Sequence, residues 1–266
     1  MTMDLSRFSL EGKVALVTGG SRGIGKATAL GFANAGADVV VTSRKLPDLE
    51  LVADEIKGLG RKSLAVATHV GRLDQIEELV KTVVGEFGRI DILVNNAGTS
   101  PVYTPAIDLE ERAWDAVMNL NLKGLFFLSQ GVARVMKEHG GGKIINVASV
   151  DAFRPQVNVG AYSISKAAVV MVTMVMAREL GQYNIRVNAI APGGVRTRLL
   201  ESLPGFQSRE SAPQAEQEAA RTPPRGPMGR VAEPDEMVGG MIYLASDASS
   251  FVTGQTFVLD GGALTR

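Results

Sequence analysis

Residues 13–36, KVALVTGGSRGIGKATALGFANAG, contain a strand, a glycine-rich turn and a helix in direct succession. Val14 to Val17 are a short apolar run typical of a buried strand, and from Ile24 the apolar residues follow helical spacing. Glycines between them let the backbone turn tightly and leave the N–H groups of the helix start open to an anion. The stretch predicts a pyrophosphate site, although an ordinary glycine turn fits the same residues.

Composition limits what the chain can be. With 266 residues, 45% of them hydrophobic, it can form one large α/β domain, and we expect a single domain over residues 1–266. The 28 basic and 28 acidic residues cancel and form no basic run, which disfavours a nucleic-acid partner. The chain has no cysteine, and its two histidines stand apart, so no metal site is expected. We see no signal or membrane segment and expect a cytoplasmic protein.

Strand and helix patterns alternate along the chain, which predicts a doubly wound parallel sheet of seven strands, the Rossmann fold. The expected strands are 13–17, 38–42, 63–67, 91–94, 143–148, 185–190 and 256–259. The expected helices are 23–35, 46–59, 72–87, 109–138, 160–181 and 234–245. Residues 197–230 break this rhythm, and we interpret them as a substrate lid, with an exposed linker as the alternative.

The end of the second strand indicates which dinucleotide is bound. In such sheets an acidic residue there binds the ribose 2′-hydroxyl, whereas an arginine accommodates a 2′-phosphate. This chain has Ser43 and then Arg44, and Arg22 lies inside the glycine turn. Two guanidinium groups near one ribose favour NADP(H), with NAD(H) as the alternative. Solvated charges at a strand end would give the same pattern.

Two further strand ends are expected to border the cofactor. His69 and Val70 follow the third strand, where the adenine would lie, and we assign His69 contact only. The fourth strand ends in Asn95-Asn96-Ala97-Gly98, whose small residues let a cofactor approach the backbone. As an isolated motif, this sequence could be a turn alone.

A serine, a tyrosine and a lysine supply the chemistry. Ser149 follows the fifth strand, and Tyr162 and Lys166 are four residues apart, on one face of the next expected helix. A neighbouring ammonium favours the phenolate, so Lys166 is expected to lower the pKa of Tyr162 and make it usable as an acid or base. Ser149 could hydrogen-bond a carbonyl oxygen. Taken alone, the tyrosine and lysine could be a surface pair.

Together these motifs resemble the single-domain branch of the short-chain dehydrogenase/reductase family, over about residues 10–262. The matching residues are TGGSRGIG (18–25), NNAG (95–98), Asn121 before Gly124, Ser149, Tyr162-x-x-x-Lys166, PGGVRT (192–197) and VLDGG (258–262). Members include reductases of 3-oxoacyl-(acyl-carrier-protein) and dehydrogenases of sugar acids and steroids. The resemblance implies hydride transfer between NADP(H) and a ketone or secondary alcohol.

The resemblance also implies residue roles. Tyr162 would be the general acid and base, Ser149 would position the substrate oxygen, Lys166 would hold the nicotinamide ribose, and Asn121 would hold a relay water. We prefer Asn121 over Asn119 because Gly124 continues its pattern. The expected cofactor contacts are Gly19, Ser21, Arg22, Gly23, Ile24, Gly25, Ser43, Arg44, His69, Val70, Asn96, Ala97, Gly98, Tyr162, Lys166, Pro192, Gly193, Val195 and Thr197.

The substrate stays open between a keto acyl thioester, a keto sugar or sugar acid, a cyclic ketone and a steroid-like alcohol. Expected pocket walls are residues 100–103, 151–158 and 199–206, where Arg154 and Gln156 could bind a carboxylate or hydroxyl. Glu138 and Tyr183 replace basic residues typical of acyl-carrier-protein reductases, which weakens that substrate. The resemblance implies a homotetramer. The alternative function is a dinucleotide-sensing protein without catalysis, although such a protein would be expected to lack the serine, tyrosine or lysine.

Overall fold

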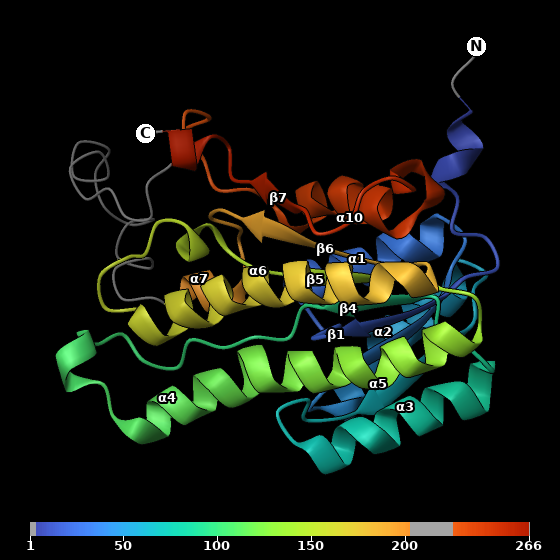
Figure 1. The fold of residues 1–266 in the computed structure, drawn as a ribbon, viewed down its shortest axis with the longest axis horizontal. Coiled ribbons are helices and arrows are strands. Elements are labelled where there is room, and N and C mark those ends of the chain that lie inside the picture. The colour runs from blue at the N-terminus through green and yellow to red at the C-terminus, as the bar shows by residue number, and fades with distance from the viewer. Residues whose placement is uncertain (1–3, 203–225, 266) are drawn as a thin grey trace.

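The structure, a computed structural model, describes residues 4–202 and 226–265. Its seven strands form one parallel sheet in the order β3-β2-β1-β4-β5-β6-β7, which confirms the predicted Rossmann-like fold (Figure 1). The strands are β1 (Val14–Thr18), β2 (Asp38–Ser43), β3 (Ser63–Ala67), β4 (Ile92–Asn95), β5 (Gly142–Val147), β6 (Ile185–Pro192) and β7 (Thr256–Leu259). The α-helices are α1 (Gly23–Asn34), α2 (Leu46–Gly58), α3 (Leu73–Phe87), α4 (Glu111–Met118), α5 (Leu125–Glu138), α6 (Gly160–Leu180), α7 (Arg198–Glu201) and α10 (Val238–Ala245).

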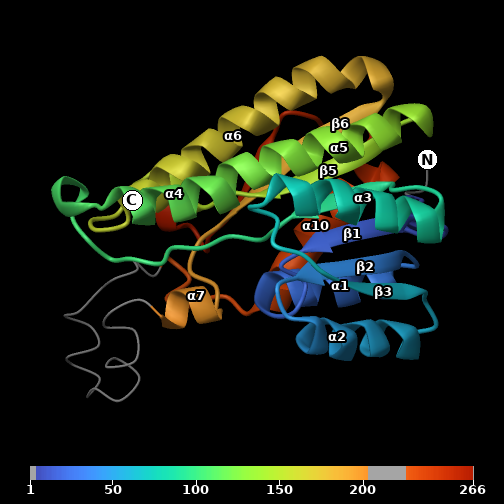
Figure 2. The ribbon, with the colours of Figure 1, turned by 90° about the horizontal axis from the view of Figure 1, so that it is seen from below.

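Helices cover both faces of the sheet (Figure 2). Successive strand residues point to opposite faces. Val39 and Val41 therefore pack with α1, α2 and α10, whereas Val40 packs with α3, α5 and α6. Because both faces are buried, the central strands are continuous apolar runs without the alternation of a half-exposed sheet.

The strand order reverses at β1, which lies between β2 and β4. Open α/β sheets bind ligands at such a switch point, outside the carboxyl ends of the strands. At this edge the chain places the glycine turn after β1, Asn96 after β4, Ser149 after β5 and Gly193 after β6. The fold thus brings together motifs that are far apart in the sequence.

The sequence predicts one continuous helix over 109–138, but in the structure this stretch is divided into α4 and α5. Between α4 and α5, residues Asn119–Gly124 form a π-helical segment. Asn121 is 1% exposed there, and its side chain bonds both the N–H and the carbonyl of Thr99. Gly124 lies against the carbonyl of Val70, where a Cβ would collide. These contacts fix the π-helical segment in place, and such segments inside α-helices are frequent at functional sites.

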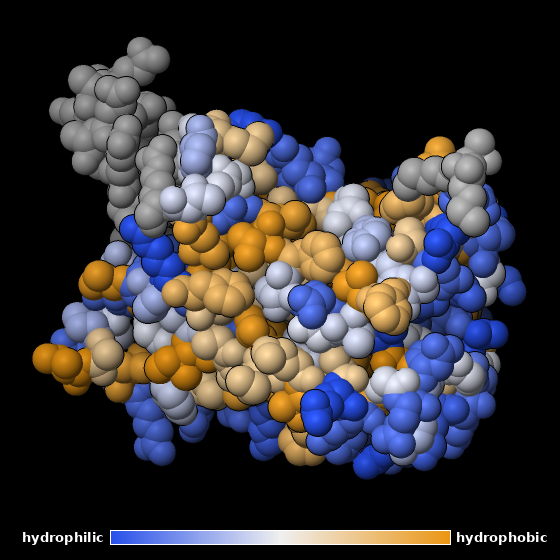
Figure 3. All heavy atoms as spheres, turned by 45° about the horizontal axis from the view of Figure 1, so that its top comes forward, coloured by the Kyte–Doolittle hydropathy of each residue, from blue (hydrophilic) through white to orange (hydrophobic). Residues whose placement is uncertain are grey.

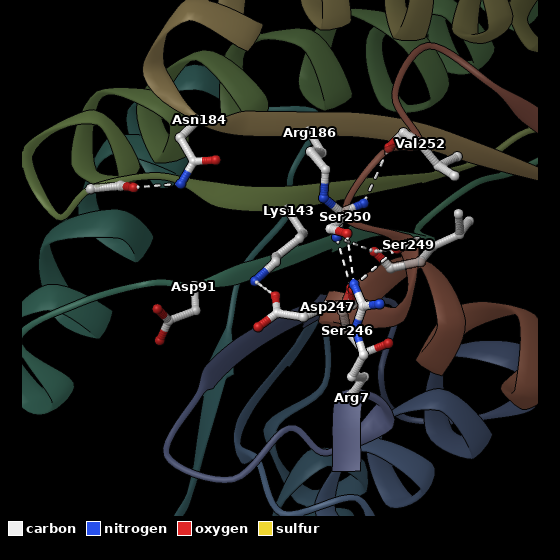
Figure 4. A network of polar contacts seen from close by, with 12 residues as sticks. Arg7, Asp91, Lys143, Asn184, Arg186, Ser246, Asp247, Ser249, Ser250 and Val252 are labelled. Carbon is white, nitrogen blue, oxygen red and sulfur yellow. Dashed lines mark hydrogen bonds and ion pairs between the residues drawn. The ribbon is translucent and has the colours of Figure 1, made fainter. Parts of the chain in front are cut away.

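A polar network ties the opposite end of the sheet to the C-terminal segment (Figure 4). Arg186 at the start of β6 donates hydrogen bonds to three backbone carbonyls, those of Leu244, Ser246 and Val252. Lys143 at the start of β5 forms an ion pair with Asp247 at 3.1 Å. These contacts fix the connection between α10 and β7 far from the carboxyl edge of the strands.

Two segments were of interest from the sequence, the predicted lid and the apolar helix that carries Tyr162. The predicted lid at 197–230 lies mostly outside the described residues, which include α7 and residues 226–230 of it. The stretch Gly160–Tyr183, which contains α6, is long and apolar enough to cross a membrane, with a mean hydropathy of 1.5. The core helix of a soluble protein passes the same test, and α6 packs against β6 through buried residues such as Val169.

Candidate active site

The glycine turn after β1 has a conformation that larger residues would strain. Gly19 and Gly23 have φ of +65° and +53°, in the left-handed region that favours glycine. A Cβ on Gly25 would collide with the carbonyl of Gly19 and come within 2.5 Å of Asn96 Nδ2. Asn96 itself donates to the carbonyl of Thr18 at 2.9 Å, so the NNAG motif braces the turn directly.

The start of α1 fits an anionic group. Its N-cap, Arg22, makes no side-chain cap, and the first turn carries no acidic residue. The partial positive charge of a helix N-terminus, together with its open N–H groups, binds phosphate well. Ser21, Ile24 and Gly25 belong to this turn, and Thr197 lies 3.2 Å from the position of a Cβ on Gly23. The residues present therefore fit the pyrophosphate of a dinucleotide.

The residues predicted for the adenosine end lie at neighbouring strand ends. Ser43 ends β2, and Arg44 and Arg22 are both exposed. His69 is half-buried, and its Nδ1 accepts a hydrogen bond from the N–H of Gly71 at 3.1 Å. This bond makes His69 a turn-stabilising residue whether or not it contacts adenine.

The predicted nicotinamide end is assembled after β6. Pro192 ends that strand, and Gly193 lies so close to Asp260 that a Cβ would come within 2.8 Å of its Cα. Val195 is buried and pairs with Ala232 in an isolated bridge. The VLDGG motif therefore supports the backbone of the PGGVRT segment.

Tyr162 and Lys166 lie on one face of α6, as predicted. The Nζ atom of Lys166 is 5.6 Å from the centroid of the Tyr162 ring. Lys166 is 4% exposed and donates to the carbonyl of Val147 at 2.6 Å. Gly98 lies beside Lys166, since a Cβ on it would be 3.6 Å from Lys166 Nζ. The NNAG motif thus also contacts the surroundings of this lysine.

Ser149 caps the short 3-10 turn Val150–Ala152 and is 8% exposed. Its Oγ accepts a hydrogen bond from the N–H of Asp151 at 3.1 Å. A hydroxyl used as an acceptor in this way keeps its own hydrogen to donate. Ser149 is also close enough to Tyr162 for a side-chain hydrogen bond that favours the phenolate.

The expectation that Lys166 lowers the pKa of Tyr162 is wrong for the chain by itself. Burial raises the pKa of Tyr162, and the negative charge of Asp151 raises it further. Burial lowers the pKa of Lys166 to about 8, because an ammonium loses its hydration there. Desolvation is the largest cause of both shifts.

Asn121 rather than Asn119 belongs to this cluster. Its Nδ2 donates to Thr99 at 2.9 Å and to Ser165 at 3.1 Å, whereas Asn119 is exposed. A Cβ on Gly98 would be 3.5 Å from Asn121 Oδ1, which places the amide beside both Gly98 and Lys166.

Sequence reasoning assigned no role to two supporting residues, Thr18 and Ser165. Thr18 accepts hydrogen bonds from the N–H groups of both Asn96 and Ala97, which joins the ends of β1 and β4. Ser165 is fully buried and donates to the carbonyl of Tyr162 at 2.7 Å. Thr18 opens the TGGSRGIG motif and Ser165 directly precedes Lys166, and these places in the motifs were the available signal.

A glycine turn at the switch point of a Rossmann sheet, with a serine, a tyrosine and a lysine gathered at the neighbouring strand end, defines the class as a Rossmann-fold oxidoreductase. The family profile described as short chain dehydrogenase matches residues 13–207. The chain belongs to the short-chain dehydrogenase/reductase family, whose members act on alcohols and ketones. The resemblance stated from the sequence is confirmed.

Relatives of known name match almost the whole chain. A 2-dehydro-3-deoxy-D-gluconate 5-dehydrogenase of Escherichia coli is 43% identical and covers 99% of this chain and 100% of its own. A 3-oxoacyl-(acyl-carrier-protein) reductase of Thermotoga maritima is 42% identical over 95% of this chain and 98% of its own. A gluconate 5-dehydrogenase structure from Burkholderia cenocepacia, in complex with NADP and tartrate, superposes with a TM-score of 0.87. It is 36% identical and covers 98% of this chain and 99% of its own.

Proposed function

We propose that this protein transfers a hydride between NADP(H) and a ketone or secondary alcohol, with Tyr162 as the general acid and base. The observation that carries the proposal is the grouping of Tyr162, Ser149 and buried Lys166 at the carboxyl end of β5. This group lies at the same sheet edge as the glycine turn. When bound, the nicotinamide would supply or accept the hydride, and the protein would supply orientation and the proton.

Each side chain has a role that its contacts support. The Ser149 hydroxyl, which accepts from Asp151, can donate to the substrate oxygen. Tyr162 can give that oxygen a proton during reduction and take it back during oxidation. The Lys166 ammonium would hold the ribose hydroxyls, and its charge would favour the phenolate during the reaction.

Asn121 would complete a path for protons to solvent. Its amide lies beside Gly98, and Gly98 lies beside Lys166. Hydrogen bonds anchor the amide to Thr99 and Ser165. An anchored amide can hold a water molecule in a fixed place, and such a water would link Lys166 to solvent.

The preference for NADP(H) rests on charge at the end of β2. Ser43 stands where an acidic residue would repel a 2′-phosphate, and the exposed Arg44 and Arg22 can bind one. The Burkholderia relative described above was determined with NADP. NAD(H) is the alternative cofactor.

We also propose a homotetramer in the cytoplasm. Figure 3 shows a broad apolar patch on the face that carries α6 and β7. Met171, Val175 and Val258 are each more than a third exposed, although side chains of this kind are normally buried. Exposed patches of this kind mark interfaces between protein chains. Light scattering after size-exclusion chromatography tests the assembly, and cell fractionation tests the location.

The substitution Tyr162→Phe tests the proposed reaction. It removes the proton donor and keeps the ring, so turnover of a ketone panel with NADPH should fall by at least about 10³-fold. Dinucleotide binding, measured by calorimetry, should change less than threefold. Wild-type protein that binds NADPH tightly but oxidises it with no ketone would instead support the alternative, a dinucleotide-sensing protein.

A further inference from the structure

Asp151 is a carboxylate held at the reacting edge of the site. It lies in the 3-10 turn Val150–Ala152, and its N–H donates to the Oγ of Ser149 at 3.1 Å. Its Oδ1 accepts a hydrogen bond from Nε2 of Gln156 at 2.8 Å. The turn and the glutamine together fix the carboxylate two residues from Ser149.

The charge of Asp151 is not balanced by the protein. Within the described ranges no cation pairs with it, and no donor reaches its second oxygen, Oδ2. It is half-buried, and burial raises the pKa of its carboxyl group. The carboxylate therefore has one oxygen free to accept a hydrogen bond from a ligand.

The carboxylate also lies near the catalytic phenol, in the turn that follows Ser149. Its charge raises the pKa of Tyr162, so the two groups share one region of low dielectric. The turn does not require this side chain, because the bond that caps Ser149 uses the backbone N–H of Asp151. The side chain is therefore free to act as an acceptor beside Ser149 and near Tyr162, the two residues that would hold a carbonyl oxygen.

We infer that Asp151, oriented by Gln156, selects the substrate by accepting a hydrogen bond from a hydroxyl group on the carbon next to the reacting carbonyl. This inference rests on the proposed function, since Tyr162 and Ser149 must hold the carbonyl for Asp151 to reach its neighbour. The substrate class is then the hydroxyketones, including polyhydroxylated ketones, and the corresponding vicinal diols. A substrate with a carboxylate at that carbon would meet a like charge and be rejected.

Matched ketone pairs test this selection. The probes are 2-hydroxycyclohexanone against cyclohexanone, and hydroxyacetone against acetone, each with NADPH. In the wild type we expect kcat/KM to be at least about tenfold higher for the hydroxylated member, because its hydroxyl donates a hydrogen bond to the charged carboxylate. In Asp151→Asn, kcat/KM for the hydroxyketone should fall about 10- to 100-fold, and that for the plain ketone should change less than threefold.

Asp115→Asn is the matched control, because Asp115 is an exposed carboxylate on α4, outside the site. It should leave both members of each pair unchanged. Equal efficiency of the two ketones in the wild type, or an equal loss for both in Asp151→Asn, would overturn the role of Asp151 and leave the reaction standing. Wild-type protein that reduces neither member of either pair would count against the proposed function and the inference together.

Discussion

The Nζ atom of Lys166 lies 5.6 Å from the ring centroid of Tyr162, and its hydrogen bond goes to the backbone carbonyl of Val147. Lys166 is thus anchored to β5, and its ammonium lies near the face of the Tyr162 ring at a distance too long for a hydrogen bond. Among residues 4–202 and 226–265 the buried ammonium has one acceptor, the carbonyl of Val147, and this leaves two of its three N–H groups for a ligand. The same burial destabilises the folded protein, because the ammonium loses its hydration.

The first prediction is that Lys166→Met changes how stability depends on pH. Burial lowers the pKa of Lys166 from 10.5 to about 8, so the unfolded chain binds more protons between these pH values. The stability of the wild type therefore gains from this group as pH rises through that window. Going from pH 7 to pH 9.5, the unfolding free energy of the wild type should rise relative to Lys166→Met by about 2 kcal/mol.

Urea unfolding at the two pH values measures this difference. Lys57→Met, at an exposed lysine on α2, controls for the loss of a lysine outside the site. The raised pKa of Tyr162 does not interfere, because its contribution to stability is lost only above about pH 10. A gap between wild type and Lys166→Met that is the same at both pH values would show that Lys166 is not desolvated.

A second prediction concerns the π-helical segment. Asn121→Ala would leave the buried N–H and carbonyl of Thr99 without their partner. We expect a loss of about 2–4 kcal/mol in unfolding free energy, since each unsatisfied buried group costs about 1–3 kcal/mol. Asn119→Ala, in the same segment but exposed, should cost less than about 0.5 kcal/mol. Similar losses for the two variants would contradict the anchoring role of Asn121.

The fold could be predicted because its signals are local. The apolar run of β1, the glycine turn and the helical spacing of α1 are adjacent in the sequence, and their order repeats along the chain. Ser149, Tyr162 and Lys166 could be placed together because a strand end and an i, i+4 pair have fixed geometry. The helices and strands could therefore be predicted without knowing which distant residues are in contact.

What could not be predicted depends on distant contacts. In the π-helical segment Asn121 bonds Thr99, 22 residues away, and no local pattern encodes this bond. The direction of the Tyr162 pKa shift depends on how deeply its ring is buried and on the charge of Asp151. Spacing puts Lys166 near the phenol, but only the packed structure shows that desolvation is the larger effect.

A third prediction concerns the cofactor. Arg44→Ala should weaken NADPH binding about 10- to 100-fold and change NADH binding less than threefold, because a guanidinium forms charge-assisted bonds with the 2′-phosphate only. Calorimetry at one fixed salt concentration measures both dissociation constants. Arg134→Ala, an exposed arginine on α5, is the control and should leave both unchanged. A wild type that binds NADH more tightly than NADPH would contradict the assignment.

The last prediction contrasts two helical glycines. Gly25→Ala would push a Cβ into the Gly19 carbonyl and toward Asn96, so we expect a loss of about 1–3 kcal/mol in stability and at least tenfold weaker dinucleotide binding. Gly85 in α3 has no atom within 4 Å of a Cβ position. Gly85→Ala should therefore add about 0.5–1 kcal/mol and leave binding unchanged. Thermal unfolding and calorimetry measure both effects, and Gly25→Ala with wild-type affinity would mean that the turn does not hold the cofactor.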